Sequence, residues 1–414
     1  MAIDIHANPY KQDFPLLANH PEIAFLDSAA TAQRPACVLD ASRHFYETMN
    51  ANPLRGLYSL SVEATEAIAK VRAQIATLIG AVDNTGKPLA NDVVFTRNTS
   101  ESLNLVAKSF APTVLKAGDE VVISIMEHHS NLIPWQQACR KAGATLVYLR
   151  PDNQGVITDS EIAAKIGPAT KIVAIGEVSN VLGVRNPVEK IAAAAHANGA
   201  YVVVDGAQSA PHMAVDVREL GADFFAFSAH KALGPMGIGV LWGKHELLDQ
   251  MPPMLTGGEM IDSVTEKDAV WAPVPQKFEA GTQDAAGIYA FDAAITYLEG
   301  IGMDRLEARE RELAAYLCER LASLPYVQVL GPVEPTRHVG AVSFVVDGVH
   351  PHDVASILDI SGVAIRAGHH CAQPLLAWLG QDSTCRASIA FYNDKGDVDR
   401  LIDALDNVRG IFGA

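Results

Sequence analysis

Short apolar segments alternate with helical patterns between residues 90 and 245, and this alternation limits the fold more than any other feature of the chain. Several segments are rich in valine and isoleucine on both faces, as expected for strands that helices cover on both sides. The alternation predicts an α/β fold with a mostly parallel seven-stranded sheet flanked by helices. The strand candidates are Asp92–Thr96, Glu120–Ile125, Thr145–Leu149, Lys171–Ile175, Tyr201–Asp205, Phe224–Ser228 and Gly239–Trp242.

A second unit with a different pattern begins near residue 300. Leucines at helical spacing predict an amphipathic helix over 303–324. Further elements are predicted at 341–346 (strand), 351–360 (helix), 363–366 (short strand) and near 387–391 (strand), before a final helix. We therefore expect a large domain over 26–298. The first 25 residues are too few to fold alone, so we expect 1–25 and 299–414 to form a smaller α+β domain.

The charge of the chain excludes several partners. A formal net charge of −16 makes it a poor ligand for nucleic acids and for anionic membranes. No run of residues approaches the roughly 18 apolar residues of a membrane span. The first residues, MAIDIHANPYKQDF, have no apolar core of a secretory signal.

The five cysteines, at positions 37, 139, 318, 371 and 385, are widely scattered. Their number is odd and no CxxC motif occurs, so the pattern favours neither a disulfide framework nor a cysteine-rich zinc site. We expect a cytoplasmic protein with free thiols, most of them buried.

Asp205 ends one predicted strand, and Ser228, His230 and Lys231 end the next, before a glycine-rich turn. A lysine directly after a buried strand is costly unless it is paired or used covalently. Pyridoxal phosphate needs a lysine for its Schiff base and a carboxylate against its pyridine nitrogen. Taken singly, Lys231 would be read as a surface lysine and Asp205 as a turn cap. The pair favours the cofactor.

Two further features fit the same cofactor. Thr99 and Ser100 are placed at a predicted helix N-terminus, where free N–H groups and the helix dipole favour a phosphate. An ordinary N-cap is the alternative. His128 follows a strand and could stack on the pyridine ring, although a lone histidine is more often structural.

Cys371 stands in the segment RAGHHCAQP, beside two histidines and downstream of Arg366. Positive neighbours raise the fraction of thiolate, which is the form that attacks sulfur. The alternative is a metal bound by His369, His370 and Cys371, but three consecutive residues chelate a tetrahedral metal poorly. Arg386 begins a predicted strand and could clamp an α-carboxylate, with a surface salt bridge as the alternative.

Nine segments together resemble the class II, or SufS-type, cysteine desulfurases over nearly the whole chain. No single segment is specific, but the set is. They are FLDSAATAQRP (25–35), RGLYSLS (55–61), MEHHSN (126–131), VSNVLG (178–183), VDGAQS (204–209), FSAHKALGPMGIG (227–239), KFEAGT (277–282), RAGHHCAQP (366–374) and CRAS (385–388).

The resemblance implies a fold-type I aminotransferase architecture and a homodimer. It implies that L-cysteine is converted to L-alanine, with a persulfide formed on Cys371, and that L-selenocysteine is also accepted. The large domain would bind pyridoxal phosphate and the small domain would carry the cysteine loop. A SufE-like or SufU-like protein would take the sulfur for iron–sulfur cluster assembly.

The resemblance also assigns roles residue by residue. Lys231 matches the Schiff-base lysine, Asp205 the partner of the pyridine nitrogen and His128 the stacking histidine. Cofactor contacts are implied for Asn180 and Gln208 at the phenolic oxygen, for Thr99, Ser100, Ser228 and His230 at the phosphate, and for Thr282 from the other subunit. Arg386 and Arg366 match the active-site arginines that bind substrate, and Asn180 lies with them.

The chain departs from the family pattern in two places. Pro53, Leu54 and Tyr58 replace the expected Val, His and His near the mouth of the site, and Asn98-Thr99-Ser100 replaces Gly-Thr-Thr. Three other functions stay open. Selenocysteine lyase would not depend on Cys371, another pyridoxal phosphate reaction such as kynurenine-type hydrolysis or transamination would need no reactive cysteine, and a non-catalytic scaffold would need no cofactor.

Overall fold

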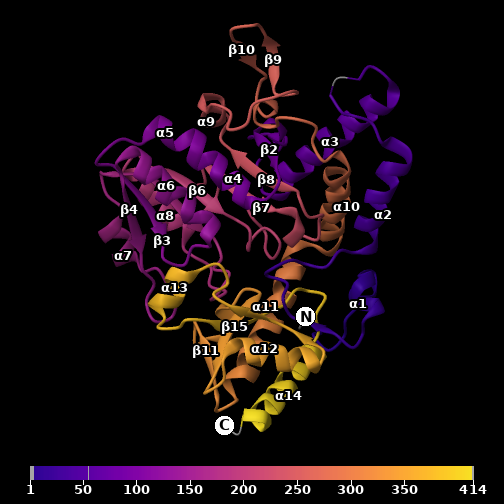
Figure 1. Ribbon diagram of the computed structural model, residues 1–414, viewed down its shortest axis with the longest axis vertical. Helices are drawn as coiled ribbons and strands as arrows, with labels where there is room; N and C mark the ends of the chain where they lie inside the picture. Colours follow the sequence, from indigo (N-terminus) through magenta and orange to yellow (C-terminus); the bar gives the residue numbers. More distant parts are fainter. Residues whose placement is uncertain (1–3, 55, 413–414) are drawn as a thin grey trace.

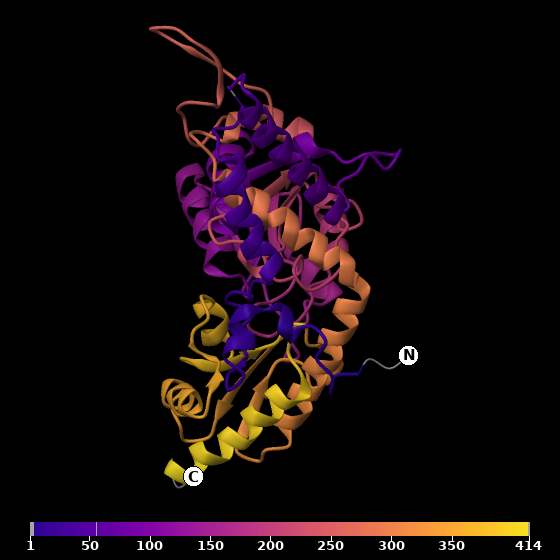
Figure 2. The ribbon, with the colours of Figure 1, turned by 90° about the vertical axis from the view of Figure 1, so that its right-hand side faces the viewer.

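The computed structural model describes residues 4–54 and 56–412, so Arg55 of the RGLYSLS segment and the chain ends 1–3 and 413–414 lie outside it. Figure 1 shows an upper part built around one large sheet and a lower part built around a smaller one. Both termini lie in the lower part, and Figure 2 shows the two parts arranged along the long axis of the molecule.

The large sheet contains all seven predicted strands, in the order β2-β8-β7-β6-β5-β3-β4. Neighbouring strands from β7 to β4 are parallel, whereas β8 runs antiparallel to β7 and to β2. A short glycine-rich turn joins β7 to β8, too short for the crossover that a parallel neighbour needs. The bounds are β2 (Val93–Thr96), β3 (Glu120–Ser124), β4 (Thr145–Leu149), β5 (Thr170–Gly176), β6 (Tyr201–Asp205), β7 (Phe224–Ser228) and β8 (Gly239–Gly243).

Helices cover both faces of this sheet, and alternate strand residues enter two separate cores. Val202 and Val204 pack with α2, α3, α8 and α10, whereas Val203 packs with α4, α6 and α9. This burial on both faces explains the continuous valine runs of the sequence. The helices are α2 (Ala36–His44), α3 (Ser59–Leu78), α4 (Thr99–Leu105), α5 (Ala111–Val114), α6 (Ile133–Ala142), α7 (Asp159–Lys165), α8 (Val188–Ala197), α9 (His245–Gln250) and α10 (Ala285–Ile301).

The lower part has a four-stranded antiparallel sheet in the order β11-β12-β15-β14. A separate core of this part collects side chains from the sheet and from its helices. The elements are α11 (Met303–Ala322), β11 (Val327–Leu330), β12 (Ala341–Val346), α12 (Pro351–Ile360), β13 (Val363–Ala364), β14 (Arg366–Gly368), α13 (Gln373–Trp378), β15 (Thr384–Ser388) and α14 (Lys395–Phe412).

Two predictions for the lower part are wrong in detail. The strand predicted at 363–366 is divided: β13 pairs with β1 (Ala24–Phe25), and β14 pairs with β15. The strand predicted near 387–391 begins and ends three residues earlier, because the backbone of Phe391 leaves the sheet. Its N–H donates to Glu310 (2.8 Å) and its carbonyl accepts from Arg309 (2.7 Å).

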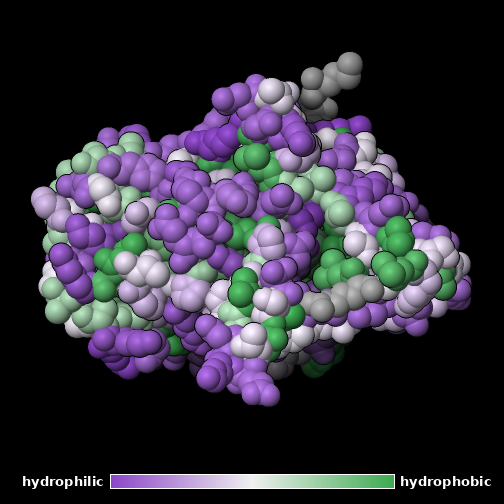
Figure 3. Space-filling model, turned by 90° about the horizontal axis from the view of Figure 1, so that it is seen from above, coloured by the Kyte–Doolittle hydropathy of each residue, from purple (hydrophilic) through white to green (hydrophobic). Residues whose placement is uncertain are grey.

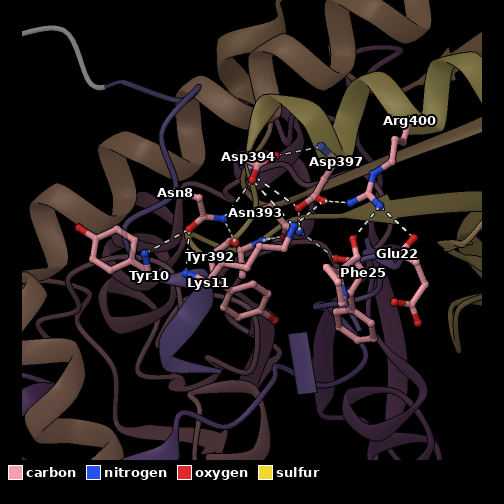
Figure 4. Close-up of polar contacts among 12 residues, drawn as sticks. Asn8, Tyr10, Lys11, Glu22, Phe25, Tyr392, Asn393, Asp394, Asp397 and Arg400 are labelled. Carbon is pink, nitrogen blue, oxygen red and sulfur yellow. Dashed lines mark hydrogen bonds and ion pairs between the residues drawn. The ribbon is translucent and has the colours of Figure 1, made fainter. Parts of the chain in front are cut away.

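The N-terminal segment is fastened to the lower part by polar contacts, shown in Figure 4. Asn8 donates to the carbonyl of Tyr392 (2.5 Å), and Lys11 pairs with buried Asp397 (2.8 Å). Arg400 of α14 donates to the carbonyl of Glu22 (2.9 Å). These contacts join the N-terminal segment, which contains α1 (Pro15–Asn19), to the turn after β15 and to the final helix.

The top of the molecule carries a two-stranded hairpin that the sequence did not predict, β9 (Ile261–Val264) with β10 (Ala269–Trp271). Seen from above, this end shows apolar patches between polar ones (Figure 3). Large exposed apolar side chains of the hairpin and of the α2–α3 connection include Leu54, Leu57, Tyr58, Val264 and Trp271. Within the described ranges, no helix has the length and apolar character to cross a membrane.

A buried ion pair ties α3 to the edge of the large sheet. Arg72 donates to both carboxylate oxygens of Glu279 (2.7 and 2.9 Å), and Glu279 also accepts the N–H of Phe95 (2.7 Å). Removing one partner leaves an uncompensated buried charge. We expect Arg72→Ala to lower the free energy of unfolding by about 3–5 kcal/mol.

Urea unfolding would measure this loss. The matched control is Arg97→Ala, which breaks an exposed pair with Glu101 and should cost less than about 0.5 kcal/mol. Equal losses of unfolding free energy for the two substitutions would show that burial does not increase the contribution of the Arg72 pair to stability.

Candidate active site

A cavity of about 240 Å³ lies where the carboxyl ends of β3, β5, β6 and β7 meet the lower part. Ligands of α/β sheets bind at this edge. Every residue predicted for the site lines the cavity except Thr282. The lining residues among them are Thr99, Ser100, His128, Asn180, Asp205, Gln208, Ser228, His230, Lys231, Arg366, Cys371 and Arg386.

Lys231 and Asp205 reach this cavity from neighbouring parallel strands. Asp205 is the last residue of β6, and Lys231 ends the short helix η6 (Ala229–Lys231) that follows β7. Burial lowers the pKa of Lys231 to about 8, and the negative charge of Asp205 opposes that change. The amine is therefore more often neutral and nucleophilic than an ordinary lysine.

The carboxyl of Asp205 is buried, which raises its pKa, while an N–H of Ala207 (3.0 Å) and the charge of Lys231 favour the ionised form. A lysine and a buried carboxylate side by side are the two groups that pyridoxal phosphate requires.

Hydroxyl groups gather at the turn between β2 and α4. The hydroxyl of Ser228 accepts the N–H of Thr99 (2.8 Å) and bonds to its hydroxyl (2.6 Å). Ser100 bonds to Ser130 through their hydroxyls (2.6 Å). These donors stand at the start of α4, where the helix dipole favours an anion. This group of hydroxyls at the start of α4 is suited to bind a phosphate. Ser130 was missed in the sequence, although it lies in MEHHSN.

Two histidines of the cavity are neutral at ordinary pH. Burial, with the charge of Lys231, lowers the pKa of His128 to about 3 and that of His230 to about 4. His128 Nδ1 accepts the N–H of Ser130 (3.1 Å), and His230 Nδ1 contacts the hydroxyl of Thr31 (3.2 Å). A neutral His128 ring can lie against an aromatic cofactor without adding charge.

Asn180 and Gln208 join the cavity wall to other segments. Asn180 donates to the carbonyl of His370 (2.8 Å), and Gln208 donates to the carbonyl of Ala29 (2.9 Å). One N–H of each amide therefore binds the cysteine loop or the N-terminal segment. The second N–H and the oxygen of each amide are left for a contact with the cofactor.

Arg386 and Arg366 face each other as register partners on β15 and β14. Arg386 lies in the middle of β15, not at a strand start as predicted. Its guanidinium is 2% exposed and donates to Asp27 (3.1 Å) and to the carbonyl of Asn180 (3.0 Å). The Nε of Arg386 is buried and has no partner in the part of the chain that the structure describes. A buried guanidinium with a free N–H is suited to bind a carboxylate.

Cys371 lies in a loop between β14 and α13 and is only partly buried. The prediction that its histidine neighbours carry positive charge is wrong for His370. Burial, with smaller contributions from the charges of Arg386 and Arg366, lowers the pKa of His370 to about 3, although a hydrogen bond to the carbonyl of Thr384 (3.1 Å) opposes the change. His370 is therefore neutral. Cationic side chains that line the cavity with the thiol are Lys231, Arg366 and Arg386.

Three of the other four cysteines are buried, and Cys37 is exposed. Burial raises the pKa of Cys139 and Cys318 to about 11 and that of Cys385 to about 12. These three thiols are unreactive as nucleophiles at neutral pH. Among residues 4–54 and 56–412, no three His, Cys, Asp or Glu side chains converge as a metal site.

Glu127 is a cavity residue that the sequence did not single out. Its carboxyl accepts from Asn131 (2.6 Å) and from the N–H of Gly176 (2.8 Å). Burial, with a smaller contribution from Asp205, raises the pKa of Glu127 to about 8. Its position directly before His128 in MEHHSN was the available signal.

Thr282 lies away from this cavity. It lines a separate hollow of the upper part together with Phe45, Tyr46 and Pro53. Of the three departures, Pro53 lines this hollow, and neither Pro53, Leu54 nor Tyr58 lines the cavity.

The neutral state of His370 predicts a pH effect on stability. Its pKa is about 3 when folded and 6.5 for an ordinary histidine, so below pH 6.5 the unfolded chain binds more protons. Acid therefore favours unfolding, by up to about 1.4 kcal/mol per pH unit from this residue. The effect can be measured as the unfolding free energy between pH 7 and 5.

His370→Asn should reduce this pH dependence by that amount, because asparagine does not titrate and tolerates the left-handed backbone at this position (φ 49°). His6→Asn, at an exposed position, should change nothing. The explanation is wrong if His370→Asn keeps the wild-type slope.

Comparisons with known proteins identify the family of the chain. The aminotransferase class-V family model matches residues 24–401. A probable cysteine desulfurase of Halalkalibacterium halodurans is 47% identical over 412 residues, covering 99% of each chain. The structure of a cysteine desulfurase from Thermococcus onnurineus NA1 is 40% identical, with a TM-score of 0.91 over 99% of each chain.

The structure of the Escherichia coli cysteine desulfurase CsdA is 38% identical, with a TM-score of 0.89, and the match covers 97% of this chain and 98% of that one. These matches cover nearly the whole chain and so include both parts of the molecule. The chain therefore belongs to the aminotransferase class-V family and, within it, to the pyridoxal-phosphate-dependent cysteine desulfurases.

Proposed function

We propose that this enzyme converts L-cysteine to L-alanine and places the released sulfur on Cys371 as a persulfide. One observation carries the proposal: Lys231 from the upper part and Cys371 from the lower part line the same cavity, beside Arg386. A lysine alone would suit many pyridoxal phosphate reactions. The thiol that shares its cavity points to sulfur transfer.

Pyridoxal phosphate fits the side chains present. Lys231 would hold it covalently, Asp205 would hold its pyridine nitrogen protonated, and His128 would lie against its ring. The hydroxyls of Thr99, Ser100 and Ser228, with His230, would bind its phosphate, and Asn180 and Gln208 its phenolic oxygen. The bound cofactor withdraws electrons from the substrate and so makes its C–S bond cleavable.

The arginines and the lysine act on the substrate itself. Arg386 has a buried N–H without a partner, which would bind the α-carboxylate of L-cysteine, with Arg366 beside it. The Nζ of Lys231 would take the proton from the substrate Cα. Its pKa of about 8 suits this exchange near neutral pH.

Cys371 receives the sulfur. Its thiolate attacks the substrate sulfur, the S–S bond forms and the C–S bond breaks. The electron pair of the C–S bond stays on the substrate carbon, which takes a proton and leaves as L-alanine. The sum is L-cysteine plus a thiol giving L-alanine plus a persulfide, so no outside oxidant or reductant is required.

Several finer assignments belong to the same proposal. The short RAGHHCAQP loop supports a class II, SufS-type enzyme, in which the persulfide waits in the cavity for a SufE-like or SufU-like acceptor and serves iron–sulfur cluster assembly. L-selenocysteine would be a second substrate. The free thiols support a cytoplasmic location.

We also propose a homodimer. Thr282 lies with Pro53 in a hollow remote from its own cavity, which supports a role in the site of a second copy. Exposed apolar side chains of the nearby α2–α3 connection and of the hairpin need a partner surface. We also propose two domains. Residues 26–298 form the domain that binds the cofactor, and residues 1–25 with 299–414 form the domain that carries the cysteine loop.

The test is a single turnover with L-cysteine labelled at sulfur. We expect one L-alanine for each labelled sulfur on the peptide that contains Cys371. Pyruvate and ammonia in place of alanine would indicate a lyase, and label on another cysteine would remove Cys371 from its role.

A further inference from the structure

The backbone of the cysteine loop is held in a conformation that non-glycine residues rarely adopt. His370 and Cys371 are consecutive and both have positive φ, 49° and 56°. Such strain persists only where surrounding contacts impose it. The contacts that impose it therefore decide where the sulfur of Cys371 lies.

Two donors from the upper part hold two consecutive carbonyls of this loop. The side chain of Asn180 donates to the carbonyl of His370 (2.8 Å), and the backbone N–H of His129 donates to the carbonyl of Cys371 (2.7 Å). Asn180 also lines the cavity, so it serves the site directly. His129 does not line it, and the mechanism above does not use this residue.

His129 makes two further contacts with the same loop. Its ring Nε2 accepts the N–H of Gln373 (3.3 Å), the first residue of α13. Its ring also lies 5.8 Å from the ring of His369, at an angle of 36°. One residue of the upper part therefore contacts the loop before Cys371, at Cys371 and after it.

We propose that His129 is a positioning residue that fixes the thiol of Cys371 toward the substrate sulfur. The inference rests on the proposed role of Cys371 as sulfur acceptor. His129 acts through the loop backbone and touches neither cofactor nor substrate. Without the contacts of His129 the strained backbone of the loop relaxes, and the thiol of Cys371 turns away from the cavity.

The backbone contact and the ring contacts of His129 can be separated by substitution. His129→Pro removes the N–H that Cys371 accepts, and the site tolerates proline because His129 begins the helix η5 (His129–Asn131) and His128 has an extended backbone (ψ 147°). His129→Ala keeps the N–H and removes the ring. His129→Gln keeps an acceptor near the position of Nε2.

Two rates are measured for each variant: alkylation of Cys371 by iodoacetamide without substrate, and persulfide formation in a single turnover. For His129→Pro we expect several-fold faster alkylation and persulfide formation slowed by about tenfold or more. His129→Ala should show the same changes to a smaller degree, and His129→Gln should lie close to wild type. The visible absorption of the bound cofactor should stay unchanged in all three.

Wild-type rates of alkylation and of transfer in a folded His129→Pro would overturn the inference. If His129→Pro does not fold or does not retain the cofactor, the comparison of His129→Ala with His129→Gln decides, and equal rates in that pair would also overturn it. Failure of the proposed function looks different. The wild-type enzyme would then place no persulfide on Cys371, whereas the alkylation rates would still report on His129.

Discussion

Lys231→Ala is expected to abolish desulfuration of L-cysteine, with a loss of at least about a thousandfold, because one side chain both anchors the cofactor and moves the Cα proton. Its burial among the strand ends, with the pKa lowered to about 8, provides an amine that can do both. The variant should also lose covalent attachment of pyridoxal phosphate. Borohydride reduction followed by peptide mass analysis would show label on the Lys231 peptide of the wild type and none on the variant.

Lys277→Ala is the matched control. Lys277 is also a buried lysine with a lowered pKa, caused by burial, but it donates to the carbonyl of Asp249 (2.7 Å) and does not line the cavity. This substitution should leave the label on Lys231. Label that persists in Lys231→Ala would place the anchor at another residue.

Cys371→Ser is expected to keep the cofactor spectrum and to lose transfer of sulfur from L-cysteine by at least about a hundredfold. Serine has nearly the same size, so the strained loop and its hydrogen bonds should persist. The hydroxyl does not form a persulfide. Alanine release and protein-bound sulfur are measured together, and a full rate of alanine release would mean that Cys371 is not the acceptor.

The same variant separates two substrates. A C–Se bond is weaker than a C–S bond, so L-selenocysteine needs less help from Cys371. Cys371→Ser should therefore retain more activity on L-selenocysteine than on L-cysteine. The matched control is Cys37→Ser, at the exposed cysteine, which should behave as wild type with both substrates.

The large sheet was predictable because its strands are buried on both faces. Runs such as Tyr201–Asp205 are apolar without alternation, which is typical of a parallel strand covered on both faces. The residues that would share a site could then be inferred, because the carboxyl ends of parallel strands meet at one edge of the sheet. Asp205 and Lys231 could be paired before any coordinates were known.

The lower part was less predictable because its backbone is directed by contacts across long sequence distances. The apolar residues Ile389 and Phe391 suggested a later strand, but Arg309 and Glu310 of α11 bind the backbone of Phe391 and end β15 at Ser388. The charge of His370 was unpredictable for the same reason. The burial that lowers its pKa, and the positions of Arg386 and Arg366 beside it, are properties of the folded loop.

The distribution of the cysteines has a practical consequence. Cys139, Cys318 and Cys385 are enclosed and have pKa values raised by burial, which leaves Cys37 and Cys371 open to reagents. In a Cys37→Ser background the protein would carry a single addressable thiol. The mass of the intact chain would then report whether the site is loaded, rising by one sulfur when the persulfide forms and falling when an acceptor removes it.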